Sequence, residues 1–435
     1  MDKLTIGLLA LGGGLALIAL RIQIGVALGI VSFFGIAAIL NMRAAWGIVT
    51  AVPFNFVGDW NLTAIPMFLL MGYVASAAGL SRGLFRAMRI FLSWLPGGLA
   101  VASIFACALL STASGSSVAT ASAFARIATP EMLRHRYEPG LASGVVAVGG
   151  TLGNLIPPGI LTVIYGYIAE VSIAKLFVAC FIPGILTAFM FSACIIIRVK
   201  LNPSLAPPVE ETFSREERLQ AVKDIWPLPV LMVGVLVGIF FGIFTPTEAG
   251  AVGAFLAFGL AAARRLLTWE VIRVSVFQTL TGTASIFMVV IGTVLLARLM
   301  ALSGVPAYLS EQLLSLGSSQ LAVVLMVAAL YLFLGCFLDA IGILLLTAPI
   351  VLPVAREAGV DLIWFGVLIV KLLEMGLITP PVGLNVYVIK AALGSMVSLT
   401  TIFRGVMWFL AVDMITLTLL ILFPWLSLVL VRFMD

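Results

Sequence analysis

Long apolar runs, separated by short polar segments, make up most of this sequence. A run of about 20 apolar residues is long enough to cross the hydrocarbon core of a bilayer as a helix. We predict such spans at residues 4–20, 22–40, 62–80, 176–197, 225–244, 249–263, 279–302 and 402–431. Residues 198–223 carry several prolines and mixed charges, and are predicted to form the one polar loop.

Three segments between these spans have the mixed character of the membrane interface. Residues 41–61 contain two tryptophans, a proline and an aspartate. Residues 269–277 are a short run in which charged and polar residues alternate with apolar ones. Residues 81–98 place Arg82, Arg86 and Arg89 at helical spacing among apolar side chains. This pattern predicts an amphipathic helix that lies in the interface.

One apolar segment is too short to cross the membrane. Residues 99–113 would form a helix of roughly 22 Å, whereas the hydrocarbon core is about 30 Å thick. A cluster of small polar residues follows, and a second apolar stretch, 118–128, can return to the starting side. We therefore predict a re-entrant helical hairpin here, and a second one at residues 313–353.

Two further apolar segments, residues 142–168 and 363–390, are interrupted by glycines and by a Pro-Pro pair. A bilayer tolerates a broken helix only where the freed backbone groups find protein, ions or water. Each segment is therefore predicted to be a broken helix beside a lined cavity.

The two halves of the chain repeat this order of elements. Pro157-Pro158 and Pro380-Pro381 are separated by the same interval as Pro130 and Pro353. Each half has a span, a hairpin and a broken helix, which indicates an internal repeat.

We divide the chain into residues 1–98 (scaffold and interfacial arm), 99–200 (first half of a transport domain), 201–312 (loop, scaffold and second arm), 313–400 (second half of the transport domain) and 401–435 (C-terminal helix). The last span is expected to join the scaffold.

Composition and charge support a multi-pass membrane protein. Only 10% of the residues are charged and 62% are hydrophobic, whereas soluble domains have roughly 25% charged residues. With the hairpins entering from opposite faces, 17 of the 24 Lys and Arg residues fall on one face, which should be cytoplasmic. The two halves are then inverted repeats, as in secondary transporters.

Several functions are disfavoured by the sequence. The net charge of +5 is too small and dispersed to indicate nucleic-acid binding. There is no GxxxxGK[ST] motif for ATP. The single histidine, His135, leaves no His-based metal site and no Ser-His-Asp triad. The four cysteines lack CxxC spacing and are predicted to be buried small side chains.

The polar residues at the hairpin tips and helix breaks are the candidate binding site. Hydroxyls and freed backbone carbonyls can bind sodium without placing a net charge in the membrane. The candidate sodium and substrate ligands are Ser111, Thr112, Ser114, Gly115, Ser116, Gly149, Gly153 and Asn154 in the first half, and Gly335, Asp339, Thr379, Pro380, Gly383 and Asn385 in the second. By pseudosymmetry, Gly335 and Asp339 would face the other four residues of their half. Close helix packing is the alternative role for such small residues.

Other charged residues within apolar runs have simpler explanations. Snorkelling to the interface is expected for both Arg298 and Lys371, with pairing to a carboxylate as the alternative. Glu374 lies three residues from Lys371, so an ion pair along one helix is the simple explanation for Glu374. Glu248 and Asp413 are interpreted as structural groups.

The combined motifs resemble a known family. STASGSSVATASAF with GGTLGNLIPPG, and GCFLDAIGILLLTAPIVLP with MGLITPPVGLN, resemble the DctM-like large membrane subunit of the tripartite ATP-independent periplasmic (TRAP) transporters. The resemblance implies an elevator transporter of the ion transporter superfamily, in the bacterial inner membrane, that is driven by sodium ions and needs no other cofactor. It also implies two partners: a separate small four-helix membrane subunit and a periplasmic substrate-binding protein. The family's substrates are organic anions such as C4-dicarboxylates, sialic acids, other sugar acids and keto acids.

The predicted fold class is therefore an all-α polytopic membrane protein, an inverted-repeat elevator transporter with two re-entrant hairpins and two broken transmembrane helices. We expect a transporter and not an enzyme. Two alternatives remain: a single-component sodium-coupled anion transporter of the same superfamily, and an intramembrane enzyme that uses Asp339 and Glu374.

Overall fold

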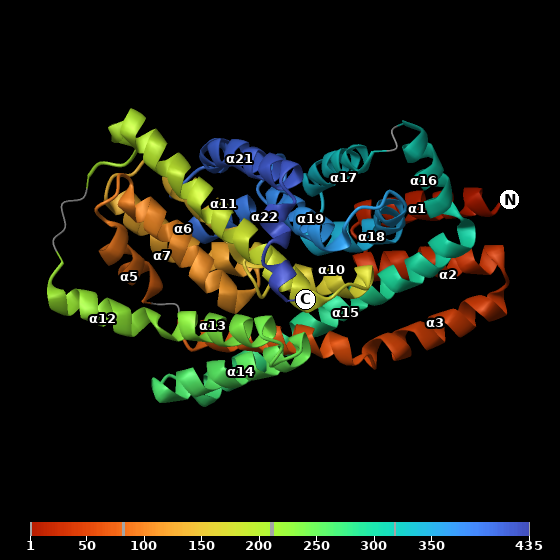
Figure 1. The fold of residues 1–435 in the computed structure, drawn as a ribbon, viewed down its shortest axis with the longest axis horizontal. Helices are drawn as coiled ribbons and strands as arrows, with labels where there is room; N and C mark the ends of the chain where they lie inside the picture. The colour runs from red at the N-terminus through yellow and green to blue at the C-terminus, as the bar shows by residue number, and fades with distance from the viewer. Residues whose placement is uncertain (1, 81–82, 209–212, 317–318, 435) are drawn as a thin grey trace.

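The computed structural model describes residues 2–80, 83–208, 213–316 and 319–434, and every regular element in these ranges is a helix (Figure 1). Arg82, part of the predicted polar loop (209–212) and residues 317–318 of the second predicted hairpin lie outside the described residues. Seven helices of the described part are long and apolar enough to cross a membrane. The predicted spans at residues 4–20, 22–40 and 225–244 form the apolar helices α1 (Lys3–Ala19), α2 (Ile24–Ile39) and α13 (Pro227–Phe240), of 17, 16 and 14 residues.

One group of helices forms the elongated lower and right-hand part of the molecule in Figure 1. It consists of α1 (Lys3–Ala19), α2 (Ile24–Ile39), α3 (Met42–Val57), η1 (Trp60–Thr63), α4 (Ala64–Ala77), α13 (Pro227–Phe240), α14 (Pro246–Ala263), α15 (Trp269–Ser303) and α16 (Val305–Leu316). Helix α15 packs along both α2 and α4, and α14 packs along α4. We call this group the scaffold.

Both predicted interfacial segments of the scaffold are helical. Residues 269–277 do not form a separate interfacial segment, because α15 runs unbroken for 35 residues, about 52 Å at 1.5 Å per residue. Its hydroxyls do not interrupt it: Thr279 and Thr281 donate to the carbonyls of Ser275 and Phe277, four residues earlier. Most of residues 41–61 also form a regular helix, α3, with Trp46 and Phe54 largely exposed.

The first half of the repeat has the predicted order of elements. It contains α5 (Leu84–Leu92), α6 (Gly98–Ser114), α7 (Ser117–Arg134), α8 (Pro139–Gly150), α9 (Leu152–Leu155), α10 (Ile160–Ala169) and α11 (Ile173–Leu201). Helices α6 and α7 form the first hairpin, and α8, α9 and α10 form the first broken helix. The most apolar window of the broken helix is fully buried, so this segment lies at the centre of the molecule.

The second half repeats this arrangement. It contains α17 (Gln320–Gly335), α18 (Ala340–Glu357), α19 (Leu362–Gly376) and α20 (Leu384–Leu393), followed by α21 (Leu399–Leu422), α22 (Trp425–Leu428) and η3 (Val431–Phe433). Helices α17 and α18 form the second hairpin, and α19 and α20 the second broken helix. Both Pro-Pro bonds, Pro157-Pro158 and Pro380-Pro381, are cis.

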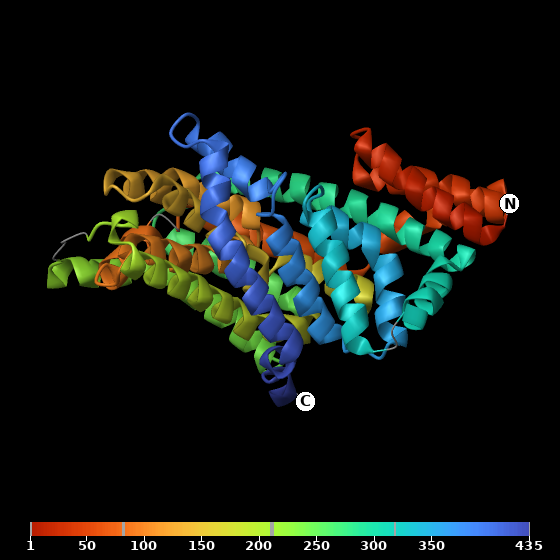
Figure 2. The same ribbon diagram turned by 90° about the horizontal axis from the view of Figure 1, so that it is seen from above.

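The position of the last span differs from the prediction. Helix α21 makes its main contacts with α8, α11, α19 and α20. In Figure 2 it is the long dark-blue helix that runs toward the C-terminus, well apart from the red N-terminal helices (Figures 1 and 2). All four contacted helices belong to the repeat, so α21 packs with the repeat and not with the scaffold.

The predicted polar loop is partly helical. Helix α11 extends to Leu201, η2 covers Pro203–Leu205, and α12 covers Arg215–Ile225. Helix α12 begins with a capping box in which Ser214 accepts from the Glu217 N–H, and Glu217 accepts from the Ser214 N–H. The S-x-x-E spacing is a known helix-start signal, so the helix was predictable from the sequence.

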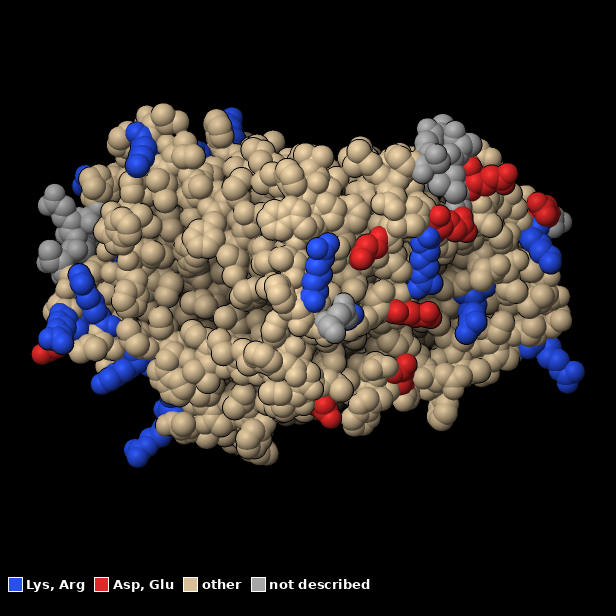
Figure 3. All heavy atoms as spheres, in the orientation of Figure 1, with Lys and Arg blue, Asp and Glu red and all other residues tan. Residues whose placement is uncertain are grey.

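Charged side chains separate along the long axis. On the face drawn in Figure 3, Lys and Arg gather at the left end with almost no Asp or Glu, whereas the right half carries both signs. The left end contains α5, α12 and the C-terminal end of α11 (Figure 1). By the positive-inside rule, this basic end is the part of the molecule expected on the cytoplasmic side.

Candidate sodium and substrate site

The tip of the first hairpin is a tight turn between two helices. Helix α6 ends at Gly115, which adopts the left-handed conformation (φ +56°) that glycine tolerates best. A Cβ at this position would lie 3.1 Å from the Pro158 carbonyl oxygen. Helix α7 then begins with Ser116 as its N-cap, whose side chain accepts from the Ala119 N–H at 3.4 Å.

The tip of the second hairpin has an equivalent N-cap. Asp339 caps α18 and accepts from the Gly342 N–H at 3.0 Å. Ser116 and Asp339 are separated by the same interval as the two Pro-Pro pairs. The repeat therefore places a hydroxyl at one tip and a carboxylate at the other.

Each hairpin packs closely against the broken helix of its own half. A Cβ at Gly153 would lie 2.6 Å from the Ser117 nitrogen. A Cβ at Gly335 would lie 2.7 Å from the Gly376 Cα. Glycine at these positions lets the backbones of tip and break approach each other.

Both tips and both breaks line one cavity of about 120 Å³. Its polar lining residues are Ser116 and Ser117 of the first tip, Asn154 of the first break and Asp339 of the second tip. The remaining lining residues are Gly115, Val118, Ile160, Leu161, Ala340, Ile341, Leu377 and Leu384. The structure thus brings the hairpin tips and helix breaks of the two halves together around one cavity, at the place that the sequence analysis selected as the candidate site.

Four helix N-termini converge on this cavity. Its lining includes the first residues of α7 (Ser117), α10 (Ile160), α18 (Ala340) and α20 (Leu384). Unpaired backbone N–H groups and the helix dipole give each N-terminus a partial positive charge. The cavity can therefore hold an anionic group without an arginine or lysine in its lining.

Several predicted first-half ligands do not reach the cavity. Ser111 and Thr112 donate to the carbonyls of Cys107 and Leu109, each at 2.7 Å. The Ser114 hydroxyl bonds to Thr120 at 2.8 Å. Gly149 packs against the Cys107 side chain. For these four residues the structure supports helix packing and capping roles.

The second half also departs from the pseudosymmetric prediction. Gly335 faces Gly376 and not residues 379–385. Thr379 donates to the Met375 carbonyl at 2.7 Å, Pro380 is half-buried, and Gly383 (φ +54°) packs near Phe403. These three residues do not line the cavity.

Asn385 crosses between the two halves of the repeat. Its amide nitrogen donates to the Ala147 carbonyl of α8 at 3.4 Å. Its side-chain oxygen is buried and has no hydrogen-bond partner among the described residues. An unpaired buried oxygen is a suitable cation ligand, because leaving it unsatisfied is costly.

Two charged residues of α19 have roles that the sequence analysis missed. Lys371 and Glu374 are each 1% exposed, so neither reaches the interface. Lys371 forms an ion pair with Asp413 of α21 and donates to Thr187 at 3.3 Å. The predicted ion pair between Lys371 and Glu374 is therefore wrong.

Glu374 instead joins the two halves of the repeat. Its carboxyl oxygens lie 2.6 and 2.7 Å from the Ser117 hydroxyl, and Asn154 donates to one of them at 2.7 Å. Both partners also line the cavity. The signal was present in the sequence: an intramembrane carboxylate is a functional candidate by default, but the nearby Lys371 suggested a local partner.

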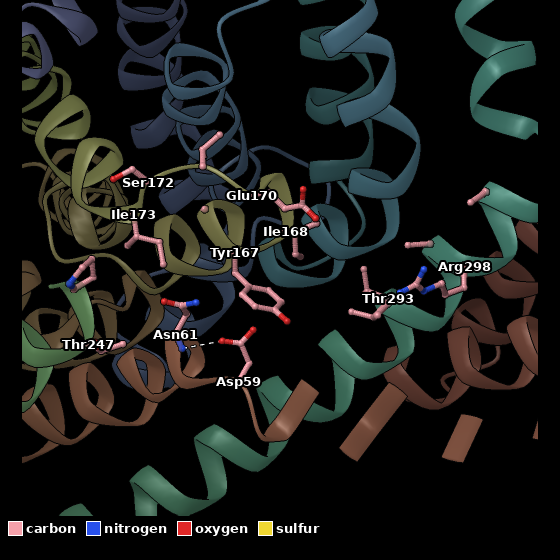
Figure 4. A pocket seen from close by; sticks show the side chains of 16 residues that line it. Asp59, Asn61, Tyr167, Ile168, Glu170, Ser172, Ile173, Thr247, Thr293 and Arg298 are labelled. Atoms are coloured by element: carbon pink, nitrogen blue, oxygen red, sulfur yellow. Dashed lines mark hydrogen bonds between the residues drawn. The ribbon is translucent and has the colours of Figure 1, made fainter. Parts of the chain in front are cut away.

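Glu248 and Arg298, the other two charged residues singled out in the sequence, lie outside the central cavity. Glu248 forms a capping box with Thr245 at the start of α14, in agreement with its predicted structural role. Arg298 is exposed on α15 and lines a second, larger cavity of about 790 Å³. Figure 4 shows Arg298 and Thr293 on one side of this cavity, with Asp59, Tyr167 and Glu170 across from them.

This larger cavity lies between the scaffold and the repeat, since η1, α14 and α15 form one side and the α10–α11 turn the other. A third cavity, of about 420 Å³, also lies between the scaffold and the repeat. It is lined by Arg21 and Gln23 of the α1–α2 turn, by α15, and by Asp339 and Ile341 of the second tip. Asp339 thus borders both the small central cavity and this scaffold-facing cavity.

Two re-entrant hairpins and two broken helices, arranged as repeats around one cavity, define a membrane transporter of the inverted-repeat class. The chain belongs to the tripartite ATP-independent periplasmic transporter family, since residues 11–426 match the model of its DctM component. It is a large permease component of this kind.

Known proteins support this assignment. The chain is 37% identical over 342 residues to the C4-dicarboxylate TRAP transporter large permease protein DctM of Pseudomonas aeruginosa, covering 77% of this chain and 78% of that protein. It is 30% identical over 410 residues to the sialic acid TRAP transporter permease protein SiaT of Haemophilus influenzae, covering 92% and 65%. The crystal structure of the Alcanivorax borkumensis YdaH transporter matches the fold with a TM-score of 0.63 at 13% identity, covering 88% of this chain and 90% of YdaH.

Proposed function

We propose that this chain imports a small organic anion together with sodium ions, as the large permease of a TRAP system. The convergence of four helix N-termini on one cavity carries the proposal, because it provides partial positive charge between the two hairpin tips of an otherwise apolar molecule. The relatives named for C4-dicarboxylate and sialic acid transport make a carboxylate the favoured substrate class.

Sodium is the proposed coupling ion because of the oxygen atoms near the cavity. Asp339 lines the cavity and offers a carboxylate, and the last turn of α6 before Gly115 offers carbonyls that lack an intrahelical partner. Asn385, which follows the lining residue Leu384, offers an unpaired amide oxygen. Hard cations favour oxygen ligands of this kind. A sodium ion would also offset the charge of Asp339 next to an anionic substrate.

The proposed mechanism is elevator-type alternating access. The hairpins, broken helices and α21 would move as one body against the scaffold. The scaffold-facing cavity that joins Asp339 to Arg21 supports a cytoplasm-facing state, because the sequence analysis assigns Arg21 to the Lys- and Arg-rich face. The larger cavity in Figure 4 also lies between the scaffold and the repeat and would change shape during the movement.

A small membrane subunit and a periplasmic substrate-binding protein are the proposed partners, because the family is tripartite. An intramembrane enzyme acting through Asp339 and Glu374 is disfavoured, since Glu374 is enclosed and bonded to Ser117 and Asn154. A single-component transporter would work without a binding protein, which the following experiment tests.

Uptake into proteoliposomes tests the proposed function. The chain and its small subunit are reconstituted, and radiolabelled succinate or N-acetylneuraminate is added with the cognate binding protein. We expect uptake only with an inward sodium gradient, with no effect of ATP. Uptake that persists when potassium replaces sodium would contradict the coupling, and uptake without the binding protein would favour the single-component alternative.

A further inference from the structure

The cavity of about 790 Å³ between the scaffold and the α10–α11 turn, which we call the outer cavity, lies toward the periplasmic face. Helix α11 begins in its lining, with Ser172 and Ile173, and ends at the basic end of the molecule (Figures 1 and 3). It has 29 residues, roughly 43 Å of helix, whereas the hydrocarbon core is about 30 Å thick. Because the basic end is expected in the cytoplasm, the outer cavity at the other end of α11 faces the periplasm.

Arg298 of α15 is the one cationic side chain among the described residues that line the outer cavity. It is exposed and forms no ion pair with any residue that the structure describes. The two acidic residues of the lining have other neighbours: Asp59 accepts from the Asn61 N–H at 2.9 Å, and Glu170 lies 4.0 Å from the Arg356 guanidinium. The charge of Arg298 is therefore available to a ligand.

The size and the polar groups of the outer cavity fit a small organic acid. Its volume of about 790 Å³ is typical of small-molecule sites, which measure roughly 300–1,000 Å³. Figure 4 shows Thr293 beside Arg298, with Tyr167 and Asn61 across the cavity. A guanidinium pairs with a carboxylate through two parallel hydrogen bonds, and hydroxyl and amide groups can bond to the other polar atoms of such an acid.

The scaffold-facing cavity on the cytoplasmic side has a similar arrangement. Arg21 is the one cationic side chain among its described lining residues, and Asp339 of the second tip also lines it. Helix α15 contributes to both cavities, with residues between 285 and 289 in one and residues between 293 and 301 in the other. Residues 285–297 of α15 are all uncharged. The scaffold therefore presents one guanidinium to each cavity and no charge along the stretch of α15 between them.

From this arrangement we infer that Arg298 is an anion-binding site at the periplasmic entrance, which takes the carboxylate of the incoming substrate before it reaches the cavity between the hairpin tips. The inference deepens the proposed function and rests on it for the identity of the anion. Snorkelling, which the sequence favoured for Arg298, explains its exposure but not its place in the lining of a cavity. An arginine that only snorkels can be replaced by glutamine without a change in anion binding, so experiment separates the two roles.

Protection of a nearby cysteine tests the site without any transport. Ala301→Cys places a thiol in the lining three residues after Arg298, on the same side of α15, in a chain whose Cys194 and Cys336 are serine. Its rate of reaction with N-ethylmaleimide is measured in membrane vesicles, with sodium chloride on both sides and with or without millimolar succinate. We expect succinate to slow the reaction at least about threefold, whereas the uncharged succinamide has no effect.

Three substitutions in this cysteine parent identify the group that binds succinate. Arg298→Gln should abolish the protection, and Arg298→Lys should keep it because the positive charge remains. Arg273→Gln is the matched control, since it removes the same charge from an exposed position of α15 that lines none of the three cavities, and its protection should equal that of the parent. The anion site would be overturned by protection that persists in Arg298→Gln or that succinamide also gives. Absence of protection in the parent, or a lysine variant that behaves like the glutamine variant, would overturn it as well.

Sodium-driven uptake is the second readout, and this arm alone rests on the proposed function. With subsaturating loaded binding protein, Arg298→Gln should lower the initial rate at least about tenfold, because a hydrogen bond to a charged group contributes that much in affinity. Arg298→Lys and Arg273→Gln should stay within about threefold of the wild type. A glutamine variant as fast as the wild type would overturn the role of Arg298 in substrate entry. Absence of sodium-driven uptake in the wild type, together with succinate protection that depends on Arg298, would refute the proposed function and leave the anion site supported.

Discussion

Replacing Asp413 with leucine will destabilise this protein by about 3–5 kcal/mol, because it leaves the buried Lys371 ammonium without its counter-charge. Both side chains are 1% exposed. Lys371 also contacts the Thr187 hydroxyl, at 3.3 Å, and the face of Phe191, 5.6 Å from its ring centroid. A hydroxyl and an aromatic ring cannot replace the negative charge of a carboxylate at a position that is buried from solvent.

The double variant Lys371→Met with Asp413→Leu is the matched control. Removing both charges leaves no unpaired ion, so most of the lost stability should return. The measurement is the melting temperature of each purified variant in detergent. A single variant as stable as the wild type, or a double variant less stable than the single one, would contradict the assignment of this pair.

Asp339→Ala will reduce sodium-driven uptake by at least about tenfold, since a hydrogen bond or ion contact to a charged group contributes more than the 1.4 kcal/mol that corresponds to tenfold. Asp339→Asn should show a similar loss, because asparagine retains the N-cap of α18 but not the charge. The measurement is the initial rate of uptake per reconstituted protein.

Asp361 offers a matched control for this substitution. It is also an aspartate N-cap of a repeat helix, accepting from the N–H groups of Ile363 and Trp364, but it does not line the central cavity. Asp361→Ala should lose about 1 kcal/mol of capping stability and keep its uptake rate within about twofold. Equal losses for the two alanine variants would show that capping, and not cation binding, explains the effect of Asp339.

The fold was largely predictable because membrane helices satisfy simple rules of length and polarity. The short run 99–113, the glycines near position 153 and the two Pro-Pro pairs predicted hairpins and breaks that the structure contains. Helix boundaries were harder to predict where polar side chains form hydrogen bonds with carbonyls of their own helix, as Thr279 and Thr281 do in α15. The hydroxyls of these threonines bond to carbonyls of their own helix, so they do not interrupt α15.

The composition of the cavity lining was less predictable than its location. Ser111 and Thr112 belong to the same polar cluster as Ser116, but a helix turns its side chains by 100° per residue, and theirs bond back to α6. Pseudosymmetry also failed for Asn385, whose side chain reaches α8 in the other half. Contacts between the halves depend on how the two repeats interlock, which the sequence of either half does not specify.

Lys371 and Glu374 show the limit of arguments from local spacing. Their separation of three residues suggested a pair along α19, but tertiary packing offered each a better partner, Asp413 and Ser117 respectively. Both partners are distant in sequence, so no helical rule could have identified them.

Labelling of a cysteine in the cavity tests the central claim most directly. Ile341→Cys is introduced at a position that borders both the central and the scaffold-facing cavities, in a chain whose less buried cysteines, Cys194 and Cys336, are serine. Leu201→Cys, 81% exposed at the end of α11, serves as the control. Membrane vesicles of both orientations are treated with an impermeant maleimide in sodium chloride or choline chloride.

We predict that Ile341→Cys reacts from the cytoplasmic side in choline and at least about threefold more slowly in sodium, while Leu201→Cys reacts equally in both salts. Equal rates for Ile341→Cys in sodium and choline, or reaction from the periplasmic side alone, would contradict a cytoplasm-facing sodium site between the two hairpin tips.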